Sequence, residues 1–281
     1  MNAPCTIRSA EQDDLPAVSD LLERCGWRDQ NRLETLSYIA QSRDGQITVA
    51  ESDRSVVGVV GALRFAGTGW VTTLVVEPGT RGRGLAARLS ETSMAWLRQG
   101  GSRTVHCLIT PQARRLAENM EFVEEGELTM GWMPALDGEP AAGEGGSKGT
   151  RALRPEDLEQ LRVLDREATG EDRSSFLRAA ADQGGVAIDG EEGELDGFDL
   201  YCRWGPGPTV ARTPEAGLEL IETRRRRWRG PRAIILPTSN DAVLAGLPEA
   251  RWFMRLTRMR WGPAVAWRPE MQFGVCNFYW G

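Results

Sequence analysis

Short runs of residues that are apolar or alternate between apolar and polar recur through the first half of the chain. Alternation with a period of two, or a short continuous apolar run, predicts a β-strand. The first two runs are joined by Ser52, Asp53 and Arg54, a polar turn that predicts a hairpin. We expect strands at residues 46–51, 55–63, 70–76, 104–109 and 123–132.

Helices are predicted between these strands. A glycine-rich turn precedes a helical run over residues 84–99, which Gly100 and Gly101 follow. Glycine best tolerates the left-handed conformation in which helices end. Leu116 and Met120 predict a further short helix before the last strand. This order of strands and helices is that of a mixed α/β fold.

The second half repeats this order. Residues 7–15 and 151–158 have similar sequences. Each predicts a short strand followed by the start of a helix, with acidic residues in the first turn, where the helix dipole favours them. Thr213 and Pro214 predict the start of a longer helix that ends before Gly230. Strands are expected at residues 185–189, 197–204, 233–236 and 251–259, and a short helix at residues 240–247.

Residues 134–149 are rich in Gly, Pro and Ala and lack apolar periodicity, which predicts a linker. A chain of 281 residues also exceeds the usual size of one domain, roughly 100–200 residues. We therefore predict two domains, at residues 1–133 and 150–281. The fold class is α/β (α+β), each domain being a mixed, mostly antiparallel sheet flanked by helices.

Composition excludes several classes of protein. No run approaches the ~18 apolar residues of a membrane span, and the first residues lack the features of a signal peptide, so we expect a cytoplasmic protein without membrane contact. Five scattered cysteines predict neither a metal site nor a disulfide framework. The net charge of −6 argues against a nucleic-acid partner. The run from Arg224 to Arg227 is explained as a helix end, where cations are favoured.

The glycine-rich turn is the strongest candidate for chemistry. Gly82 and Gly84 lie between an apolar strand and a helix, so the chain can turn tightly and point several backbone N–H groups outward. Such a nest, with the positive end of the helix dipole, binds phosphate. Arg81 and Arg83 can add charge-assisted hydrogen bonds.

Residues 74–89 resemble the coenzyme-A motif of the GNAT superfamily, in which Arg81, Gly84 and Ala86 fill the three defined positions. The resemblance implies two GNAT-like domains in tandem, with acetyl-CoA or a related acyl-CoA as cofactor. It implies that the backbone of Leu74 and Val76 pairs with the pantetheine arm and that the turn holds the pyrophosphate. The implied cofactor-binding residues are Leu74, Val75, Val76, Arg81, Gly82, Arg83, Gly84, Leu85 and Ala86.

Residues 109–122 resemble the closing segment of the same family, with two departures. Ala117 stands where the family commonly has the tyrosine that protonates the departing thiolate, and Glu121 stands where glycine is usual. The usual general acid is therefore missing.

The second half resembles the C-terminal GNAT-like domain of tandem bacterial acetyltransferases, at residues 164–173 and 255–259. Residues 210–217 contain no glycine nest, and Pro214 removes an N–H group where phosphate needs one. We expect no coenzyme A in this half.

Candidates for catalysis and substrate binding are weaker. By resemblance, the backbone N–H near Val76 donates to the oxyanion, and Thr72 is a polar residue of the same strand. His106 is either a general base, if its ring faces the cleft, or a hydrogen-bonded structural residue. Trp27, in a loop that faces substrate by resemblance, and Trp70 are candidate substrate contacts or packing residues.

The aromatic tail after Met259 is expected to pack between the domains, where it either lines the acceptor pocket or only packs. The predicted function is acyl-CoA-dependent N-acyl transfer, most simply acetyl transfer to a small-molecule amine by a monomer or homodimer. The alternative is a GNAT-fold protein that catalyses another acyl-CoA reaction or only binds acyl-CoA, because Ala117 replaces the general acid.

Overall fold

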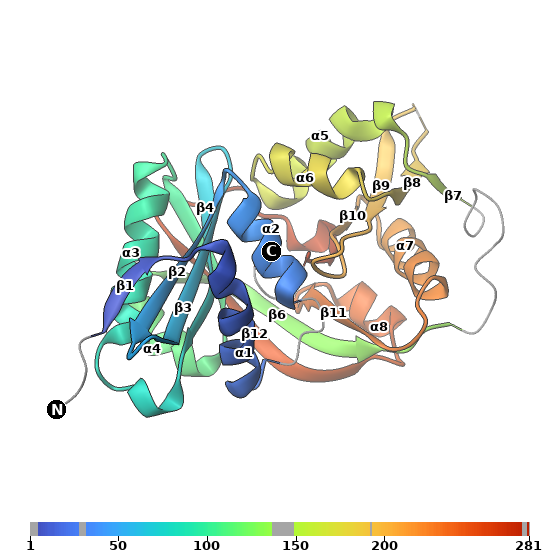
Figure 1. Cartoon of the computed structure of the whole chain (residues 1–281). Helices are drawn as coiled ribbons and strands as arrows, with labels where there is room; N and C mark the ends of the chain where they lie inside the picture. Colours follow the sequence, from blue (N-terminus) through green and yellow to red (C-terminus); the bar gives the residue numbers. More distant parts are fainter. Residues whose placement is uncertain (1–4, 28–31, 137–148, 192, 277–279, 281) are drawn as a thin grey trace.

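The computed structural model describes residues 5–27, 32–136, 149–191, 193–276 and 280 (Figure 1). Most of the predicted linker, residues 137–148, lies outside the described residues. In the described part no helix is long and apolar enough to cross a membrane.

The described part of the first half contains six strands and four α-helices. In chain order they are β1 (Thr6–Ser9), α1 (Leu15–Arg24), α2 (Arg32–Gln41), β2 (Gly45–Ser52), β3 (Ser55–Arg64), β4 (Thr68–Val76), α3 (Leu85–Gln99), β5 (Thr104–Ile109), α4 (Arg114–Asn119) and β6 (Val123–Met133).

Seven strands and four α-helices are found among the described residues of the second half. They are β7 (Thr150–Ala152), α5 (Leu158–Thr169), α6 (Ser174–Ala181), β8 (Gly185–Asp189), β9 (Leu195–Leu200), β10 (Thr209–Ala211), α7 (Pro214–Arg226), β11 (Arg232–Pro237), α8 (Asp241–Gly246), β12 (Arg251–Trp261) and β13 (Gln272–Gly274).

The predicted element order is present in both halves, with two shifts in the second. Strand β9 ends at Leu200 rather than at Trp204, because Pro206 and Pro208 follow closely and cannot donate to a strand ladder. Helix α7 ends at Arg226, four residues before Gly230. The predicted hairpin turn is confirmed, with Asp53 and Arg54 both at positive φ, as a tight two-residue turn requires.

The two halves exchange their last long strands. The larger sheet has eight strands in the order β1-β2-β3-β4-β5-β12-β6-β11. Strand β12 of the second half thus pairs with β5 of the first, and β6 of the first pairs with β11 of the second. Strands β6 and β12 also pair with each other over their length. Neither half therefore closes its own sheet, a feature that element order alone does not predict.

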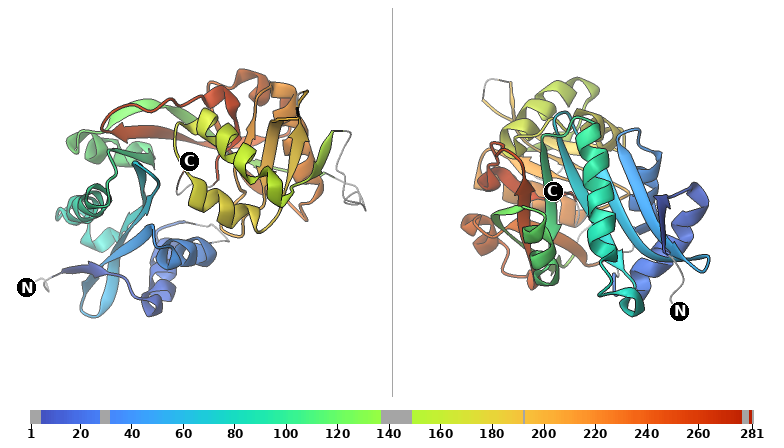
Figure 2. Two further views of the ribbon diagram at one scale, coloured as in Figure 1. Left: turned by 90° about the horizontal axis from the view of Figure 1, so that it is seen from above. Right: turned by 90° about the vertical axis from the view of Figure 1, so that its left-hand side faces the viewer.

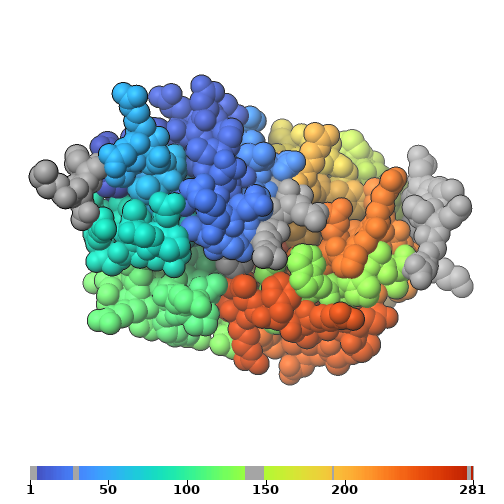
Figure 3. All heavy atoms as spheres, turned by 60° about the horizontal axis from the view of Figure 1, so that its bottom comes forward, coloured from blue at the N-terminus to red at the C-terminus, as the bar shows by residue number. Residues whose placement is uncertain are grey.

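Helices cover both faces of the part of this sheet that the first half of the chain forms. Helices α1 and α2 lie on one side of β2 and β3, and α3 lies on the other (Figure 2). The smaller sheet, in the order β13-β10-β9-β8-β7, has α5 and α7 packed against it. In Figure 3 the blue-to-green first half and the yellow-to-red second half form one continuous surface.

One hydrophobic core spans both halves. Leu21 and Leu36, from α1 and α2, belong to the same buried cluster as Phe176 of α6 and Trp280 of the tail. The ring of Tyr38 stacks on that of Trp204 at 4.2 Å between centroids. The halves are therefore joined by packing as well as by strand pairing.

A buried polar network also crosses between the halves. The guanidinium group of Arg258, on β12, lies 5.0 Å from the ring centroid of Trp70 and 4.7 Å from that of Trp267. Its Nε lies 3.0 Å from a carboxylate oxygen of Glu125, which also lies 3.2 Å from Nδ1 of His106. Such buried charges are tolerated only because each has partners.

This network sets the ionisation of Glu125. Burial raises the pKa of its carboxyl group, but the neighbouring His106 and Arg258 lower it more, and the resulting pKa is about 2. The ordinary pKa of glutamate is 4.5. The ionised carboxylate is therefore part of the folded structure at every pH above about 2.

We expect the free energy of unfolding to fall as the pH is lowered from about 4.5 to 2, because the unfolded chain then takes up a proton that folded Glu125 resists. The variant Glu125→Gln is expected to be less stable at pH 7 and to lose less stability across this window. Urea unfolding at a series of pH values measures both. The control Glu124→Gln removes an exposed carboxylate paired with Arg114 and should change the free energy of unfolding little. Equal pH dependence of stability in the wild type and Glu125→Gln would contradict the low pKa assigned to Glu125.

Candidate functional site

Strands β4 and β5 separate soon after they begin. They pair in parallel only over three positions, from Thr68 with Thr104 to Trp70 with His106. Beyond Trp70, β5 continues in the sheet with β12, while in the described part of the chain β4 pairs only with β3. The side of β4 that faces β5 is therefore open from Val71 onward.

A bulge in β4 shapes this open edge. The register with β3 shifts between Val59 and Gly61, and Thr73 has φ +53°. A positive φ is rare for a β-branched residue and marks local strain. Bulges re-aim backbone groups and side chains and recur next to active sites.

The backbone of β4 directs alternate residues to the open edge. The N–H group of Glu77 donates to the carbonyl of Val57 on β3 at 2.9 Å. Because hydrogen-bonding groups alternate along a strand, the N–H groups of Val76 and Leu74 face away from β3. The carbonyl of Val76 accepts a hydrogen bond from Nε of Arg81 at 2.9 Å, which fastens the following turn to the strand end.

The turn before α3 is a nest of backbone donors. Gly82 and Gly84 have φ of +77° and +73°, which favours glycine, and a Cβ at either position would meet nothing within 4 Å. Within the described residues, the N–H groups of residues 82–87 have no backbone acceptor. The turn therefore presents several donors and the positive end of α3 to one open space.

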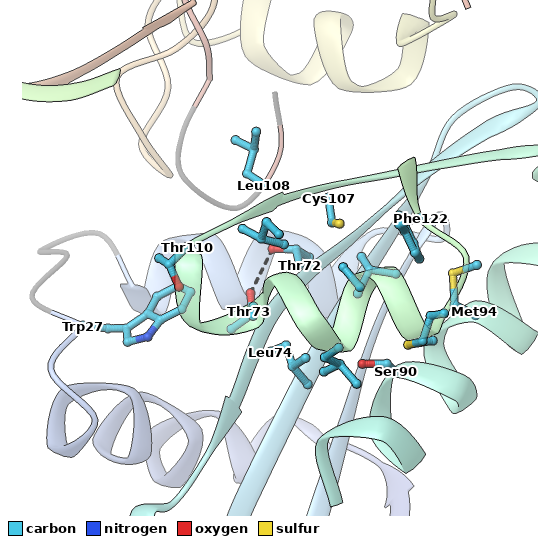
Figure 4. Close-up of a pocket in the computed structure, with 16 residues that line it drawn as sticks. Trp27, Thr72, Thr73, Leu74, Ser90, Met94, Cys107, Leu108, Thr110 and Phe122 are labelled. Atoms are coloured by element: carbon cyan, nitrogen blue, oxygen red, sulfur yellow. Dashed lines mark hydrogen bonds between the residues drawn. The ribbon is translucent and has the colours of Figure 1, made fainter. Parts of the chain in front are cut away.

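A small cavity of about 110 Å³ lies where β4 and β5 diverge (Figure 4). Figure 4 shows Trp27 and Thr110 at one end of it and Met94 and Phe122 at the other. The hydroxyl groups of Thr72 and Thr73 are 3.1 Å apart at its wall. The apolar side chains that complete the wall include Val71, Leu74, Leu108, Leu116, Ala117 and Met120.

A much larger cleft, about 1370 Å³, adjoins the small cavity and lies between the two halves. The two spaces share Trp27, Leu74, Thr110, Ala113 and Leu116 in their walls. The first half contributes the nest and residues of β6, and the second half contributes residues of α7, β11 and β12. A ligand held by the nest therefore lies in a space that the second half helps to enclose.

The predicted cofactor-binding residues come together. All of them except Arg83 line the cleft, and Thr72 lies in the adjoining small cavity, with Trp27 in the wall of both. Ala117 also lines the small cavity and is buried, so the side of α4 that faces the diverging strands carries only a methyl group there.

His106 and Trp70 lie elsewhere. Both are fully buried, and neither lines the small cavity or the cleft. The indole Nε1 of Trp70 donates to the carboxylate of Glu171, and His106 lies between that residue and Glu125. Their placement corrects the predicted catalytic and substrate-binding roles and supports the structural alternative for each, since packing between the halves occupies both side chains.

The described residues of the tail pack between the halves and line neither space. Among the described residues after Met259, Trp280 joins the shared core, Trp267 covers Arg258 and Phe273 lies in a cluster of the second half. This described part of the tail therefore has a packing role, while Phe278 and Tyr279, which also belong to the predicted aromatic tail, lie outside the described residues. Its strand β13 instead pairs with β10.

Sequence reasoning missed the residues that the exchanged strands and the second half contribute to the cleft. Trp132 on β6 and Phe253 on β12 are 46% and 49% exposed, and their rings stack at 5.8 Å. Both line the cleft, as do Arg227 and Arg232. Aromatic residues at these strand positions indicate a wall of the cleft only when the strand exchange is known.

Among the described residues, no obvious proton acceptor lines either space. In the described part of the chain, no aspartate, glutamate or histidine lines the small cavity or the cleft. Cys107 lines the small cavity, and burial raises the pKa of its thiol to about 12, so the thiol is neutral at ordinary pH. No cluster of three or more possible metal ligands is found among the described residues.

Comparisons with known proteins agree with this geometry. The acetyltransferase (GNAT) family profile matches residues 11–122, and an acetyltransferase (GNAT) domain profile matches residues 161–274. No curated protein matches the chain.

Solved structures share the whole architecture at low sequence identity. A proposed acetyltransferase from Pyrococcus horikoshii superposes with a TM-score of 0.80 at 20% identity, over 99% of this chain and 96% of that one. A GCN5-related N-acetyltransferase from Sphaerobacter thermophilus superposes with a TM-score of 0.65 at 17% identity, over 94% of this chain and 98% of that one. At these identities the matches establish the fold of both halves.

The backbone conformation of Glu121, which follows the helix that carries Ala117, can be tested by measuring stability. This residue follows α4 at φ +65°, and the N–H of Phe122 donates to the carbonyl of Ala117 while that of Glu121 donates to Glu118. This is the Schellman end of a helix, where glycine is preferred. We expect Glu121→Gly to raise the free energy of unfolding by about 0.5–1 kcal/mol in urea titrations. The control Glu118→Gly, within α4, should lower it by about 1 kcal/mol; a loss of stability in both variants would contradict the strain at Glu121.

Proposed function

Because the chain belongs to the GNAT acetyltransferase family, with two such domains in tandem, we propose that it transfers an acyl group from acetyl-CoA, or a related acyl-CoA, to a small-molecule amine. The observation that carries this proposal is the open edge of β4 followed directly by the nest at residues 82–87. The second half shapes the acceptor side of the cleft.

The geometry supports one orientation of the cofactor. The N–H groups of residues 82–87 and the positive end of α3 suit the pyrophosphate. The pantetheine arm carries amide groups, and the outward backbone of Leu74 and Val76 offers them strand-like hydrogen bonds. The thioester then lies towards the small cavity, beside Thr72 and Thr73. In this orientation the N–H of Val76 is the candidate donor to the oxyanion.

The reaction that this arrangement suits needs few catalytic groups. The neutral amine nitrogen attacks the thioester carbonyl carbon, a C–N bond forms and the C–S bond breaks. The new amide nitrogen loses its extra proton to water, and the thiolate of CoA, a leaving group of modest pKa, takes a proton from water. Holding the two reactants together supplies the main rate advantage.

A second candidate is a different acyl-CoA reaction, or binding of acyl-CoA alone. Two observations favour it: Ala117 offers no proton to a leaving thiolate, and the described walls of both spaces contain no carboxylate or imidazole. The nest supports cofactor binding under either candidate.

Calorimetric binding of acetyl-CoA tests the shared premise. We expect Gly84→Glu to weaken binding by more than about 100-fold, because it places a non-glycine residue at φ +73° and a negative charge in the phosphate site. The control Gly79→Glu adds the same side chain nearby, where the space is open and φ is not positive, and should weaken binding far less. Mass spectrometry of mixtures with acetyl-CoA and a panel of amines then detects the product. No binding by the wild type would refute the proposal, and tight binding without product from any amine would favour the second candidate.

The pH dependence of the reaction tests the absence of a side-chain base. We expect kcat/KM to rise about tenfold per pH unit below the pKa of the acceptor amine, since only the neutral amine is a nucleophile. The plateau should move when an amine of different pKa is used. Initial rates with two amines between pH 6 and 10 measure this. A plateau fixed near neutral pH for both amines would instead indicate a titrating group of the protein.

A further inference from the structure

The four consecutive arginines at the end of α7 do not share one environment. Arg224 is buried with Asp199, Arg225 pairs with Glu249, and Arg226 pairs with Glu222. Arg227 has no carboxylate partner among the described residues, is exposed and lines the cleft. Its guanidinium carbon lies 4.1 Å from the centre of the Tyr201 ring.

The cleft contains a second arginine of this kind. Arg232 begins β11, is exposed and lines the cleft, and no described carboxylate pairs with it. Since no aspartate or glutamate lines the described wall, the cleft is positive although the chain carries a net charge of −6. A local reversal of charge in a concave site favours an anionic ligand.

An apolar wall lies in the same cleft. Trp132 and Phe253 stack on one another and remain about half exposed, and Met254 beside them is 36% exposed. All three line the cleft. Exposed aromatic surface in a large cavity is a recognition surface for an apolar or aromatic body.

We propose that the acceptor is an amine that carries both an oxyanion, carboxylate or phosphate, and an apolar, preferably aromatic, body. Arg227 and Arg232 bind the oxyanion, and the wall of Trp132, Phe253 and Met254 holds the body. This inference rests on the proposed function for its assignment of the ligand as acceptor. The phosphates of the cofactor already have the nest of the first half, whereas both arginines belong to the second half.

Paired acceptors test the proposal. L-phenylalanine, phenethylamine and O-phosphotyramine share a ring and an amine but differ in the oxyanion. Comparing wild-type protein with the double variant Arg227→Gln/Arg232→Gln removes the effect of different amine basicity. We expect the double variant to lose on the order of 10- to 100-fold in kcat/KM for the carboxylate or the phosphate amine, through KM. Its kcat/KM for phenethylamine and its affinity for acetyl-CoA should stay within about threefold.

A matched control and a binding measurement complete the test. Arg229→Gln removes the same charge from the same region but outside the cleft lining, and it should change neither acceptor nor cofactor parameters. Calorimetric binding of the three amines without turnover separates this proposal from the function. If the wild type binds no acetyl-CoA, the proposed function fails, while preferential binding of the oxyanion amines still supports the anion site.

Two results would overturn the inference. Equal losses of kcat/KM for phenethylamine and for the oxyanion amines would show that the arginines do not bind the oxyanion. A loss of acetyl-CoA affinity in the double variant, with acceptor binding unchanged, would assign both arginines to the cofactor.

Discussion

The pairing of β6 with β12 is the constraint on which the rest of the structure depends. Because each half gives its last long strand to the other, the open edge of β4 and the second half's cleft wall belong to one eight-stranded sheet. A strand ladder of this length cannot shift by one residue without turning buried side chains outward. The nest of the first half and the arginines of the second are thereby held in one cleft.

The two halves share an element order, but only one keeps an open site. In the first, β4 and β5 diverge and the nest follows. In the second, β13 pairs with β10, the N–H of Val275 donates to Ile235 on β11, and the gap is filled by the chain's own tail. A Cβ on Gly217 would lie 1.9 Å from the ring of Phe273, so this glycine of α7 allows the tail to enter. Thr213 caps the N-terminus of α7 by accepting from Ala216, which uses a donor that a phosphate would need.

Residue types that carry chemistry elsewhere serve here to join the halves. His106, Glu125, Glu171 and Arg258 are all buried or nearly so and satisfy one another, with Trp70 against the guanidinium group. Removing one member leaves another charge without compensation, which is costly in a buried site. A lone histidine on the strand that follows α3 therefore acts in this fold as part of the interface.

The sequence by itself determined what depends on neighbouring residues: the hairpin at Asp53 and Arg54, the limits of β5 and the glycine nest before α3. Turn conformation, strand alternation and helix ends are set within a few positions, so they are visible in a single chain. Tertiary structure alone decided the strand exchange, the burial of His106 and which arginine of the run at the end of α7 is both exposed and in the cleft lining. His106 meets Arg258 across 152 positions, and Arg224 meets Asp199 across 25. No local pattern encodes such partners, because burial and pairing at those distances are set by how the two halves pack.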